Sequence, residues 1–354
     1  MVYPFRPSRR LVASLMTAFA GALALGTLST PAVAQDKVSV GVLRFVSSGG
    51  LFLAYEKGYF KAEGLDVDLK FFEAAQPIAL AAVSGDVDFG VTAFTGGFFN
   101  LAAKGALKII AAQAKEAKGY EGNLVLASKG AAEKGLADIG QLPGKSLGIS
   151  QVGSSFHYQM GQIARIKGFD LASIDMKPLQ SLPNMMAALK TSQVDAIIIA
   201  PHLAKALIAS GDAKLLARYS DLDEYQFGGL FAATRTLAAK RAITERFVRA
   251  YQKGAGDYFA AFLQKDASGA RVMGADADAA AALIARSVYP GEAAETAVPK
   301  VRASAFYVDP QARLDVADIV KQVGWYKAAG MVDAGAEARS MLDLGFIQGH
   351  LNAN

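Results

Sequence analysis

The 354-residue chain contains no cysteine and only three histidines. Without cysteine it has no disulfide, no thiolate nucleophile and no lipidated cysteine to hold it at a membrane. His157, His202 and His350 stand far apart, and no histidine and carboxylate cluster has the spacing of metal ligands. We therefore expect no metal and no other cofactor. Stability must come from packing, for which a chain with 52% apolar residues has ample material.

Long apolar runs are absent except near the beginning of the chain. Three arginines at positions 6, 9 and 10 precede the apolar run 11–28 and the small residues Ala32-Val33-Ala34. This order is typical of a signal peptide that ends at residue 34. The residues after the arginine pair are smaller than those of a twin-arginine signal, so the sequence favours general secretion and a periplasmic location. A retained membrane anchor is the alternative interpretation.

Excess positive charge is also lacking once this leader is set aside. The formal charge is +5, and residues 1–34 carry three arginines and no acid, so the remainder has 5 − 3 = +2. No later segment combines a Lys/Arg-rich run with interleaved aromatic residues. We therefore expect no nucleic-acid partner.

The sequence contains a weak internal repeat. Gly41-Val-Leu-Arg-Phe-Val-Ser-Ser48 aligns without a gap on Gly148-Ile-Ser-Gln-Val-Gly-Ser-Ser155, at an offset of 148 − 41 = 107 residues. The same offset places Ala79–Ala93 on Met186–Ala200, so that Val87-Asp88 aligns with Val194-Asp195. Two matches at one offset predict two structurally equivalent lobes.

Each repeat unit alternates predicted strands with predicted helices. In the first unit, strands are expected at 38–43, 67–72 and 87–92, and helices at 50–57 and 77–83. This alternation indicates an α/β fold in which each lobe has a mostly parallel sheet flanked by helices. The extended segments 123–128 and 228–235 are interpreted as a two-strand hinge between the lobes. Lobe 1 is then 35–127 with 229–354, and lobe 2 is 128–228; predicted helices at 240–263, 275–287, 309–329 and 335–342 are expected to cover lobe 1.

The predicted ligand site lies where these strands end. Ligands of open α/β sheets bind beside the carboxyl ends of the strands, and both Ser-Ser loops also open a helix, whose free N–H groups favour an anion. The candidate polar residues are Ser47, Ser48, Thr92, Thr95, Gln151, Ser154 and Ser155, each of which could instead cap a helix. The candidate apolar walls are Phe45, Phe94 and Phe156, which could instead belong to the core. His157 and His202 are further candidates that could instead bond backbone carbonyls.

Arg44 is the strongest single candidate for contacting the ligand. It directly follows the first predicted strand, where a guanidinium can form paired hydrogen bonds to a carboxylate or sulfonate. A surface ion pair is the alternative role. The neighbouring phenylalanines favour an organic acid with an apolar body.

Catalytic motifs are not found in these loops. The Ser47-Ser-Gly-Gly50 loop lacks the endings of nucleotide-binding loops, and Gly153-Ser-Ser-Phe-His157 lacks the Gly-x-Ser-x-Gly pattern of serine hydrolases. We therefore expect a binding protein and not an enzyme.

Three segments resemble one family of receptors. Glu56-Lys-Gly-Tyr-Phe-Lys-Ala-Glu-Gly-Leu-Asp-Val-Asp68 is similar to a signature of periplasmic substrate-binding proteins of the nitrate, sulfonate, taurine and thiamine-precursor group, which serve ABC importers. Leu142–Ile149 and Ala187–Ala196 are similar to the same group. The resemblance implies a type II periplasmic-binding-protein fold. It also implies a monomer that captures a small organic anion between two lobes and passes it to membrane permease and ATPase subunits.

Other functions stay open at this point. Within the family, a thiamine-type pyrimidine or another vitamin precursor is an alternative ligand. From a different class, the superfamily is similar to pyrimidine-synthesising enzymes that use pyridoxal phosphate, but those carry a cysteine cluster and work in the cytosol. A sensor or adaptor without a transport partner is a third alternative.

Overall fold

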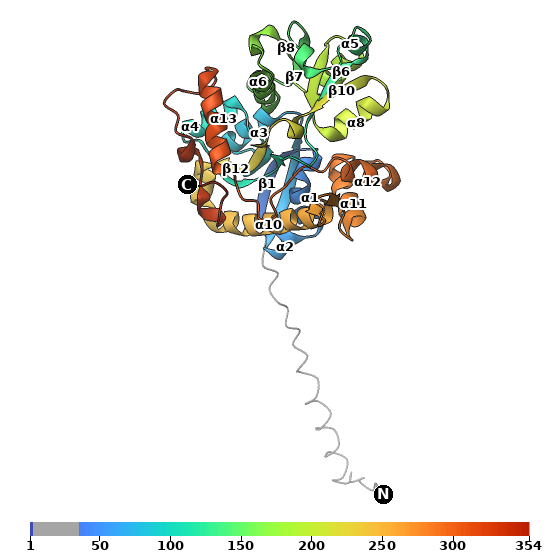
Figure 1. Cartoon of the computed structure of the whole chain (residues 1–354). Coiled ribbons are helices and arrows are strands. Elements are labelled where there is room, and N and C mark those ends of the chain that lie inside the picture. Colours follow the sequence, from blue (N-terminus) through green and yellow to red (C-terminus); the bar gives the residue numbers. More distant parts are fainter. Residues whose placement is uncertain (3–34, 354) are drawn as a thin grey trace. The chain divides into compact units, whose positions relative to one another are not determined.

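The computed structural model describes residues 1, 2 and 35–353, so the predicted signal peptide lies outside the described residues. Residues from Gln35 onward form one unit, and its secondary structure is shown in Figure 1. Among the described residues, no helix has both the length and the apolar character that crossing a bilayer requires.

The first sheet has the strand order β2-β1-β3-β12-β4. Its strands are β1 (Asp36–Leu43), β2 (Leu65–Phe72), β3 (Phe89–Ala93), β4 (Leu107–Ala112) and β12 (Gly228–Ala233). β1 pairs in parallel with β2 and β3, whereas β12 runs antiparallel to β3 and β4. Four strands therefore run one way and one runs against them.

The second sheet repeats this arrangement with the strand order β10-β6-β9-β7-β8. Its strands are β6 (Leu124–Ser128), β7 (Ser146–Ile149), β8 (Asp175–Pro178), β9 (Ala196–Ile199) and β10 (Ala213–Arg218). β7 is parallel to β8 and β9, and β6 is antiparallel to β9 and β10. Read from its β8 edge, the second sheet has the order β8-β7-β9-β6-β10, which matches β2-β1-β3-β12-β4 of the first sheet position by position.

The register of the strands confirms the internal repeat. Gly41 pairs with Lys70 and Gly90, and Gly148 pairs with Lys177 and Ile197. Each residue of the second group lies 107 positions after its counterpart in the first, since 148 − 41, 177 − 70 and 197 − 90 all equal 107. The repeat detected in the sequence is therefore a repeat of strand pairing.

A side-chain motif recurs at the same offset. The amide of Ser39 donates to Asp88 at 3.0 Å, and the amide of Asp88 donates to the Ser39 hydroxyl at 3.1 Å. Ser146 and Asp195 form the equivalent pair of bonds at 2.8 and 2.9 Å. Each pair joins the first strand of a sheet to the residues around the start of the third, where it fixes the register.

The crossings between the sheets differ from the predicted hinge. The chain passes between the sheets at β5 (Lys115–Glu116) and β11 (Tyr225–Gln226), which pair antiparallel. The predicted crossings 123–128 and 228–235 lie just beyond these points and mostly form β6 and β12 inside the two sheets. Both strands are apolar and buried along their whole length, which explains why they belong to sheets and not to linkers.

Helices cover both sheets, and most predicted helices are present. The structure has α1 (Gly49–Glu56), α2 (Tyr59–Ala62), α3 (Ala75–Ser84), α4 (Gly96–Ala103), α5 (Lys129–Glu133), α6 (Ser155–Lys167), α7 (Leu182–Lys190), α8 (Pro201–Ala209), α9 (Thr234–Ala239), α10 (Arg241–Phe262), α11 (Ala277–Val288), α12 (Ala294–Arg302) and α13 (Val316–Ala328). The short β13 (Gln264–Lys265) and β14 (Arg271–Val272) form a ribbon after α10. The segment predicted as a helix at 335–342 contains only a 3-10 turn, Ala338–Met341.

The C-terminal helices do not all stay with the first sheet. α10 packs on α1 and α2, and α11 packs on α1, as expected for a cover of lobe 1. α13 packs on α4 of the first half and also on α6 of the second half. Figure 1 shows α13 beside both α4 and α6. This helix therefore spans the junction between the two halves.

Candidate functional site

The carboxyl ends of the parallel strands of both sheets meet at one cleft. Two adjoining pockets form it, and they share Leu43, Phe45, Glu73 and Leu182. Three of these residues follow or end β1 and β2 of the first sheet, and Leu182 begins α7 after β8 of the second. The cleft therefore lies where the strand-end rule predicts a ligand site.

The first pocket, here called the serine pocket, is narrow, with a cavity volume of about 20 Å³. It is lined by Leu43, Phe45, Glu73, Ala74, Ala75, Ala93, Thr95, Ser150, Gln151, Ser154, Ser155, Phe156, Leu182 and Phe227. Hydroxyl groups therefore face apolar side chains across it.

Two hydroxyls of the serine pocket also cap helices. Thr95 accepts from the amide of Phe98 at the start of α4, at 2.9 Å. Ser154 accepts from the amide of His157 at the start of α6, at 3.3 Å. The N-termini of both helices are therefore held at the cleft, where their free amides favour a negatively charged or strongly accepting group.

The second pocket, here called the arginine pocket, is larger, with a cavity volume of about 190 Å³. It is lined by Leu43, Arg44, Phe45, Phe72, Glu73, Leu182, Pro183, Met186, His202, Leu203, Val288 and Tyr289. Most of these side chains are apolar, a composition typical of sites for small organic molecules.

Arg44 occupies the arginine pocket without a carboxylate partner among residues 35–353. Its guanidinium lies 3.6 Å from the ring centroid of Phe71 and donates one hydrogen bond to the carbonyl of Ser287 at 2.7 Å. A guanidinium has five N–H groups, so donors remain for a ligand. The surface ion pair considered as the alternative role is not formed.

His202 reaches the same pocket from the second half of the molecule. Its side chain is 4% exposed, and its ring stands edge-on to that of Phe45 with centroids 4.9 Å apart. Burial lowers the pKa of His202 to about 3, and a hydrogen bond with the backbone of Arg44 opposes the shift only in part. The imidazole is therefore neutral at physiological pH.

Direct contacts join the two halves beside the cleft. The amide of Gly96 donates to the carbonyl of Gly153 at 2.8 Å. The hydroxyl of Tyr326, on α13, donates to the carbonyl of Ser154 at 3.3 Å. The first contact joins the loop before α4 to the loop before α6, and the second joins α13 to the latter. The Ser154-Ser155 loop therefore meets the loop after β3, and not the Ser47-Ser48 loop that is its counterpart in the repeat.

The structure brings eight of the thirteen predicted site residues to the cleft. They are Arg44, Phe45, Thr95, Gln151, Ser154, Ser155, Phe156 and His202. Their contact with a ligand stays a prediction.

The other five predicted residues do not line either pocket. Phe94 packs against Phe98 and Phe99 in the core. The Ser48 hydroxyl accepts from Gln113, and the hydroxyls of Ser47 and Thr92 are buried without a partner among the described residues. His157 accepts from the amide of Gly153 and stands edge-on to Trp325. For Phe94 the structure shows the core role that was considered as the alternative. His157 bonds the backbone, but as an acceptor from an amide and not as a donor to a carbonyl.

Sequence reasoning missed several lining residues. Glu73 directly follows β2, so the same strand-end rule that selected Arg44 would have found it. Leu182 and Met186 belong to α7, the helix that follows β8. The strand-end rule applied to β8 would therefore have pointed to them too. Tyr289 follows α11, and no local pattern predicts that the end of a distant helix reaches the cleft.

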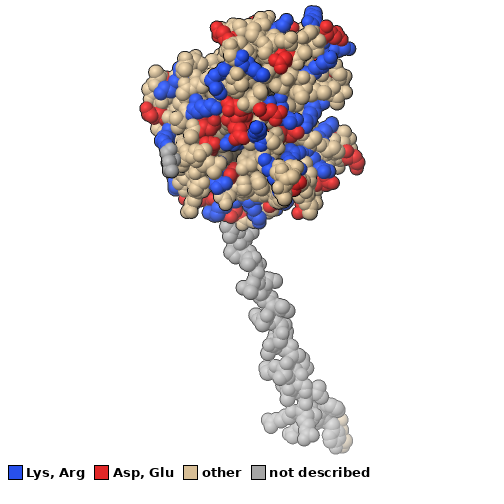
Figure 2. Space-filling view, in the orientation of Figure 1, with Lys and Arg blue, Asp and Glu red and all other residues tan. Residues whose placement is uncertain are grey.

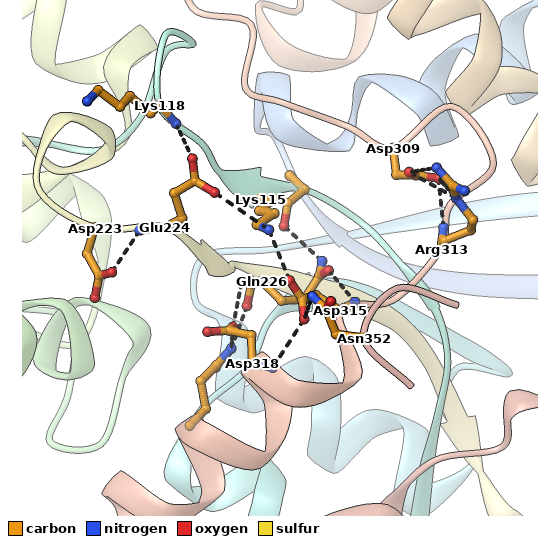
Figure 3. Close-up of polar contacts among 12 residues, drawn as sticks. Lys115, Lys118, Asp223, Glu224, Gln226, Asp309, Arg313, Asp315, Asp318 and Asn352 are labelled. Carbon is orange, nitrogen blue, oxygen red and sulfur yellow. Dashed lines mark hydrogen bonds and ion pairs between the residues drawn. The ribbon is translucent and has the colours of Figure 1, made fainter. Parts of the chain in front are cut away.

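The hinge contains charged groups that are unusually buried. Figure 2 shows Asp and Glu side chains gathered near the middle of the face in view, between the upper and lower halves. Figure 3 shows part of the hinge network, in which Lys115 of β5 contacts Asp315 at 3.0 Å and Asp318 accepts from the amide of Gln226 at 2.7 Å. Burial raises the pKa of Asp318 to about 6.

Glu116, on the other side of the hinge strand β5, is fully buried. Its Oε1 accepts from the amide of Asn123 at 3.0 Å and from Gln159 of α6 at 2.9 Å, whereas its Oε2 has no partner among the described residues. Burial raises the pKa of Glu116 to about 8 despite these two bonds. The carboxyl of Glu116 thus links the hinge strand β5 to Asn123 and to Gln159 of α6.

A family model described as NMT1/THI5 like matches residues 46–261, more than half of the chain. No curated protein sequence matches the chain.

Solved structures share the fold at low sequence identity. The alkanesulfonate-binding protein SsuA from Xanthomonas axonopodis pv. citri, bound to MOPS, is 18% identical with a TM-score of 0.69, over 87% of this chain and 98% of that one. The periplasmic nitrate-binding protein NrtA from Synechocystis PCC 6803 is 10% identical with a TM-score of 0.65, over 87% and 85%. The enzyme DszB, in complex with biphenyl-2-sulfinic acid, is 14% identical with a TM-score of 0.56, over 88% and 97%. These likenesses establish the periplasmic-binding-protein fold.

Proposed function

Because the chain belongs to the NMT1/THI5-like family and has the periplasmic-binding-protein fold, we propose that it is the solute receptor of an ABC importer. Its ligand is a small organic acid with an apolar body, held in the cleft between the two sheets. The protein acts in the periplasm as a monomer and delivers the solute to permease and ATPase subunits in the membrane.

The observation that carries this proposal is the uncommitted charge of Arg44 in a cleft that is lined mostly by apolar side chains. The guanidinium is held in place by Phe71 and the Ser287 carbonyl, yet no carboxylate within residues 35–353 neutralises it. A carboxylate or sulfonate can complete its hydrogen bonds in a geometry that a guanidinium favours. The surrounding side chains of Phe45, Phe72 and Met186 suit a hydrocarbon body.

Lobe motion supplies the mechanism. The first sheet with its helices and the second sheet with its helices act as two lobes that rotate about β5 and β11. A ligand that touches Arg44 on one side and Ser155 or His202 on the other binds only when both lobes are close. Its affinity for the closed state shifts the population toward that state, which the permease then recognises.

A thermal-shift screen of the chain from residue 35 tests the proposal. The protein is refolded once to remove any solute carried through purification. It is then mixed with sulfonates, carboxylates, inorganic oxyanions and pyrimidines. We expect a rise in melting temperature with organic carboxylates or sulfonates, because a ligand that binds only the folded state stabilises it. Shifts only with pyrimidines would contradict the organic acid and favour a vitamin precursor, and absorbance in the pyridoxal region would favour an enzyme.

A further inference from the structure

The serine pocket contains two hydroxyl groups that the protein leaves without a partner. Ser150 and Ser155 line this pocket, and the two residues are 9% and 6% exposed. Neither hydroxyl forms a hydrogen bond within residues 35–353, and neither is sealed from solvent as the unpartnered hydroxyls of Ser47 and Thr92 are. Both hydroxyls are therefore open, and the pocket is the space that their residues adjoin.

Two backbone amides of α6 are free at the same place. Ser154 caps this 13-residue helix by accepting from the amide of His157 at 3.3 Å, and its own amide donates to Gln151 at 3.0 Å. The amides of Ser155 and Phe156 have no partner within residues 35–353, because the first N–H groups of a helix lie outside its internal hydrogen bonding. Both residues line the serine pocket. Hydroxyl and amide donors of the second half of the molecule thus gather there.

The group that suits these donors is an oxygen acceptor without a charge. Among residues 35–353, no lysine, arginine or histidine lines the serine pocket, whereas Glu73 does. An anion placed there would lose its hydration without gaining a cation and would lie near a like charge. This cost exceeds the attraction that one helix N-terminus exerts on an anion. A carbonyl oxygen accepts from hydroxyls and amides and brings no net charge.

The size of the pocket limits this group further. Its cavity volume of about 20 Å³ is close to the roughly 10–15 Å³ that one water molecule needs. A single carbonyl oxygen fits such a space, whereas a sulfonate with three oxygens does not. The arginine pocket, with about 190 Å³, can take the acidic group and the body. Because the two pockets share Leu43, Phe45, Glu73 and Leu182, one solute can enter both.

We propose that the solute carries, besides its acidic group, an uncharged carbonyl group of a ketone or an amide, and that Ser150 and Ser155 donate to this oxygen in the serine pocket. The inference rests on the proposed function, because it names the class of organic acid that the same cleft selects. The preferred solutes are then oxo acids or carbamoyl acids. Plain acids, dicarboxylates and inorganic oxyanions bind more weakly. Ser150 and Ser155 are thereby specificity-determining residues in the lobe opposite Arg44.

Calorimetric titration of the chain from residue 35 with matched acids tests this inference. Each straight-chain acid from pentanoate to octanoate is compared with its oxo derivative, whose carbonyl adjoins the terminal methyl group, and with the dicarboxylate of the same length. An aromatic series compares acetylbenzoates and carbamoylbenzoates with isopropylbenzoates and benzenedicarboxylates. We expect at least one carbonyl-bearing acid to bind tenfold or more tightly than both of its counterparts. Equal or weaker binding by every carbonyl-bearing acid would overturn the inference, while binding of the plain acids would leave the organic-acid receptor intact.

Substitutions of serine assign the preference to the two hydroxyls. Ser150→Ala and Ser155→Ala each remove a hydroxyl that has no partner in residues 35–353, so the melting temperature of the free protein should change little. Each should reduce the preference for the carbonyl-bearing acid at least threefold without weakening the plain acid. The double variant should retain only the preference that the free amides of α6 supply.

Ser47→Ala is the matched control. Ser47 also has a hydroxyl without a partner among the described residues, but it lines neither pocket, so this variant should keep the full preference. An undiminished preference in the double variant would overturn the assignment to Ser150 and Ser155. If neither the plain nor the carbonyl-bearing acids bind the wild-type protein, the proposed function fails and this inference fails with it.

Discussion

The amide of Gly96 donates a 2.8 Å hydrogen bond to the carbonyl of Gly153, which joins the loop before α4 to the loop before α6. The two loops belong to different halves of the molecule, and each carries a helix-capping hydroxyl that lines the serine pocket. Backbone groups therefore join the two halves beside the cleft without any solute. A change that disturbs this contact should weaken binding.

Replacement of Gly153 by alanine should affect both stability and affinity. Gly153 has φ +78°, a conformation that costs an alanine about 1–2 kcal/mol. The added Cβ would lie 3.4 Å from the sulfur of Met331 and 3.8 Å from Gly96, which is ordinary contact, so backbone strain is the main effect. We expect a loss of about 1 kcal/mol in the free energy of unfolding and weaker binding of the solute.

Gly168→Ala is the matched control for this prediction. Gly168 has φ +75° at the end of α6, with no atom within 4 Å of an added Cβ. It should lose similar stability in denaturant titrations but keep wild-type affinity. Equal affinities of the two variants would show that the Gly96 contact does not couple to binding.

Trp325 should report the motion of the lobes. It is the only tryptophan of the sequence and lies on α13, where its ring stands edge-on to Tyr158 of α6 with centroids 5.3 Å apart. Because α13 also packs on α4, a change in the angle between the halves alters the surroundings of the indole. We expect a saturable change in tryptophan emission during titration with an organic acid that binds. Trp325→Phe should abolish the signal but not the calorimetric affinity, and constant emission during saturable binding would argue against lobe motion at α13.

Much of this arrangement could be predicted from the sequence, and the repeat explains why. The pairs Ser39–Asp88 and Ser146–Asp195 repeat at one offset, so local patterns were sufficient to place both sheets and their strand ends. The position of Arg44 at the cleft followed from those strand ends. The predicted hinge lies a few residues beyond the observed one, because a buried strand and an extended linker have similar apolar patterns in the sequence.

The remaining lining residues depend on packing at long range. Tyr289 reaches the cleft because α11 packs on α1, and no pattern near residue 289 contains that information. Phe94 has the aromatic side chain expected of a pocket wall and directly follows β3, yet its ring packs against Phe98 and Phe99. A sequence therefore locates the ends of strands, whereas tertiary packing decides which side chains there face the ligand.

Glu116 should make stability fall as pH rises. Its pKa in the fold is raised to about 8 from an ordinary value near 4.5. Between these values the folded chain binds a proton that the unfolded chain has released, so stability is greatest at low pH in this window and is lost as pH rises toward 8. The loss can reach about 1.4 kcal/mol per pH unit. Denaturant titrations between pH 6.5 and 8.5 measure it as a difference from a variant that does not titrate at this position, because the three histidines, whose pKa values burial lowers, stabilise the fold as pH rises through the same range.

Glu116→Gln provides the control for this pH dependence. A glutamine can keep the oxygen that accepts from Asn123 and Gln159, and it does not titrate. The variant should lack this loss, so its stability relative to the wild type should rise across the same range, while the three histidines contribute equally to both proteins. An equally steep loss in the variant would place the titrating group elsewhere.

The proposed function depends most on Arg44, and Arg235 provides a closely matched control for its replacement. Arg44 donates to the Ser287 carbonyl near the end of α11, and Arg235 donates to the Val83 carbonyl near the end of α3, each at 2.7 Å. Both arginines are exposed, but only Arg44 lines the cleft. Loss of either side chain therefore removes one equivalent hydrogen bond to a carbonyl. Only the loss of Arg44 should also remove the proposed contact with the solute.

The most direct test is calorimetric titration of three proteins, the wild type, Arg44→Ala and Arg235→Ala, with the organic acid that gives the largest thermal shift. We predict one solute per chain and wild-type affinity for Arg235→Ala. Arg44→Ala should bind at least tenfold more weakly, because a charge-assisted hydrogen bond is worth about 1.5–3 kcal/mol. Equal affinities of Arg44→Ala and the wild type would contradict the account.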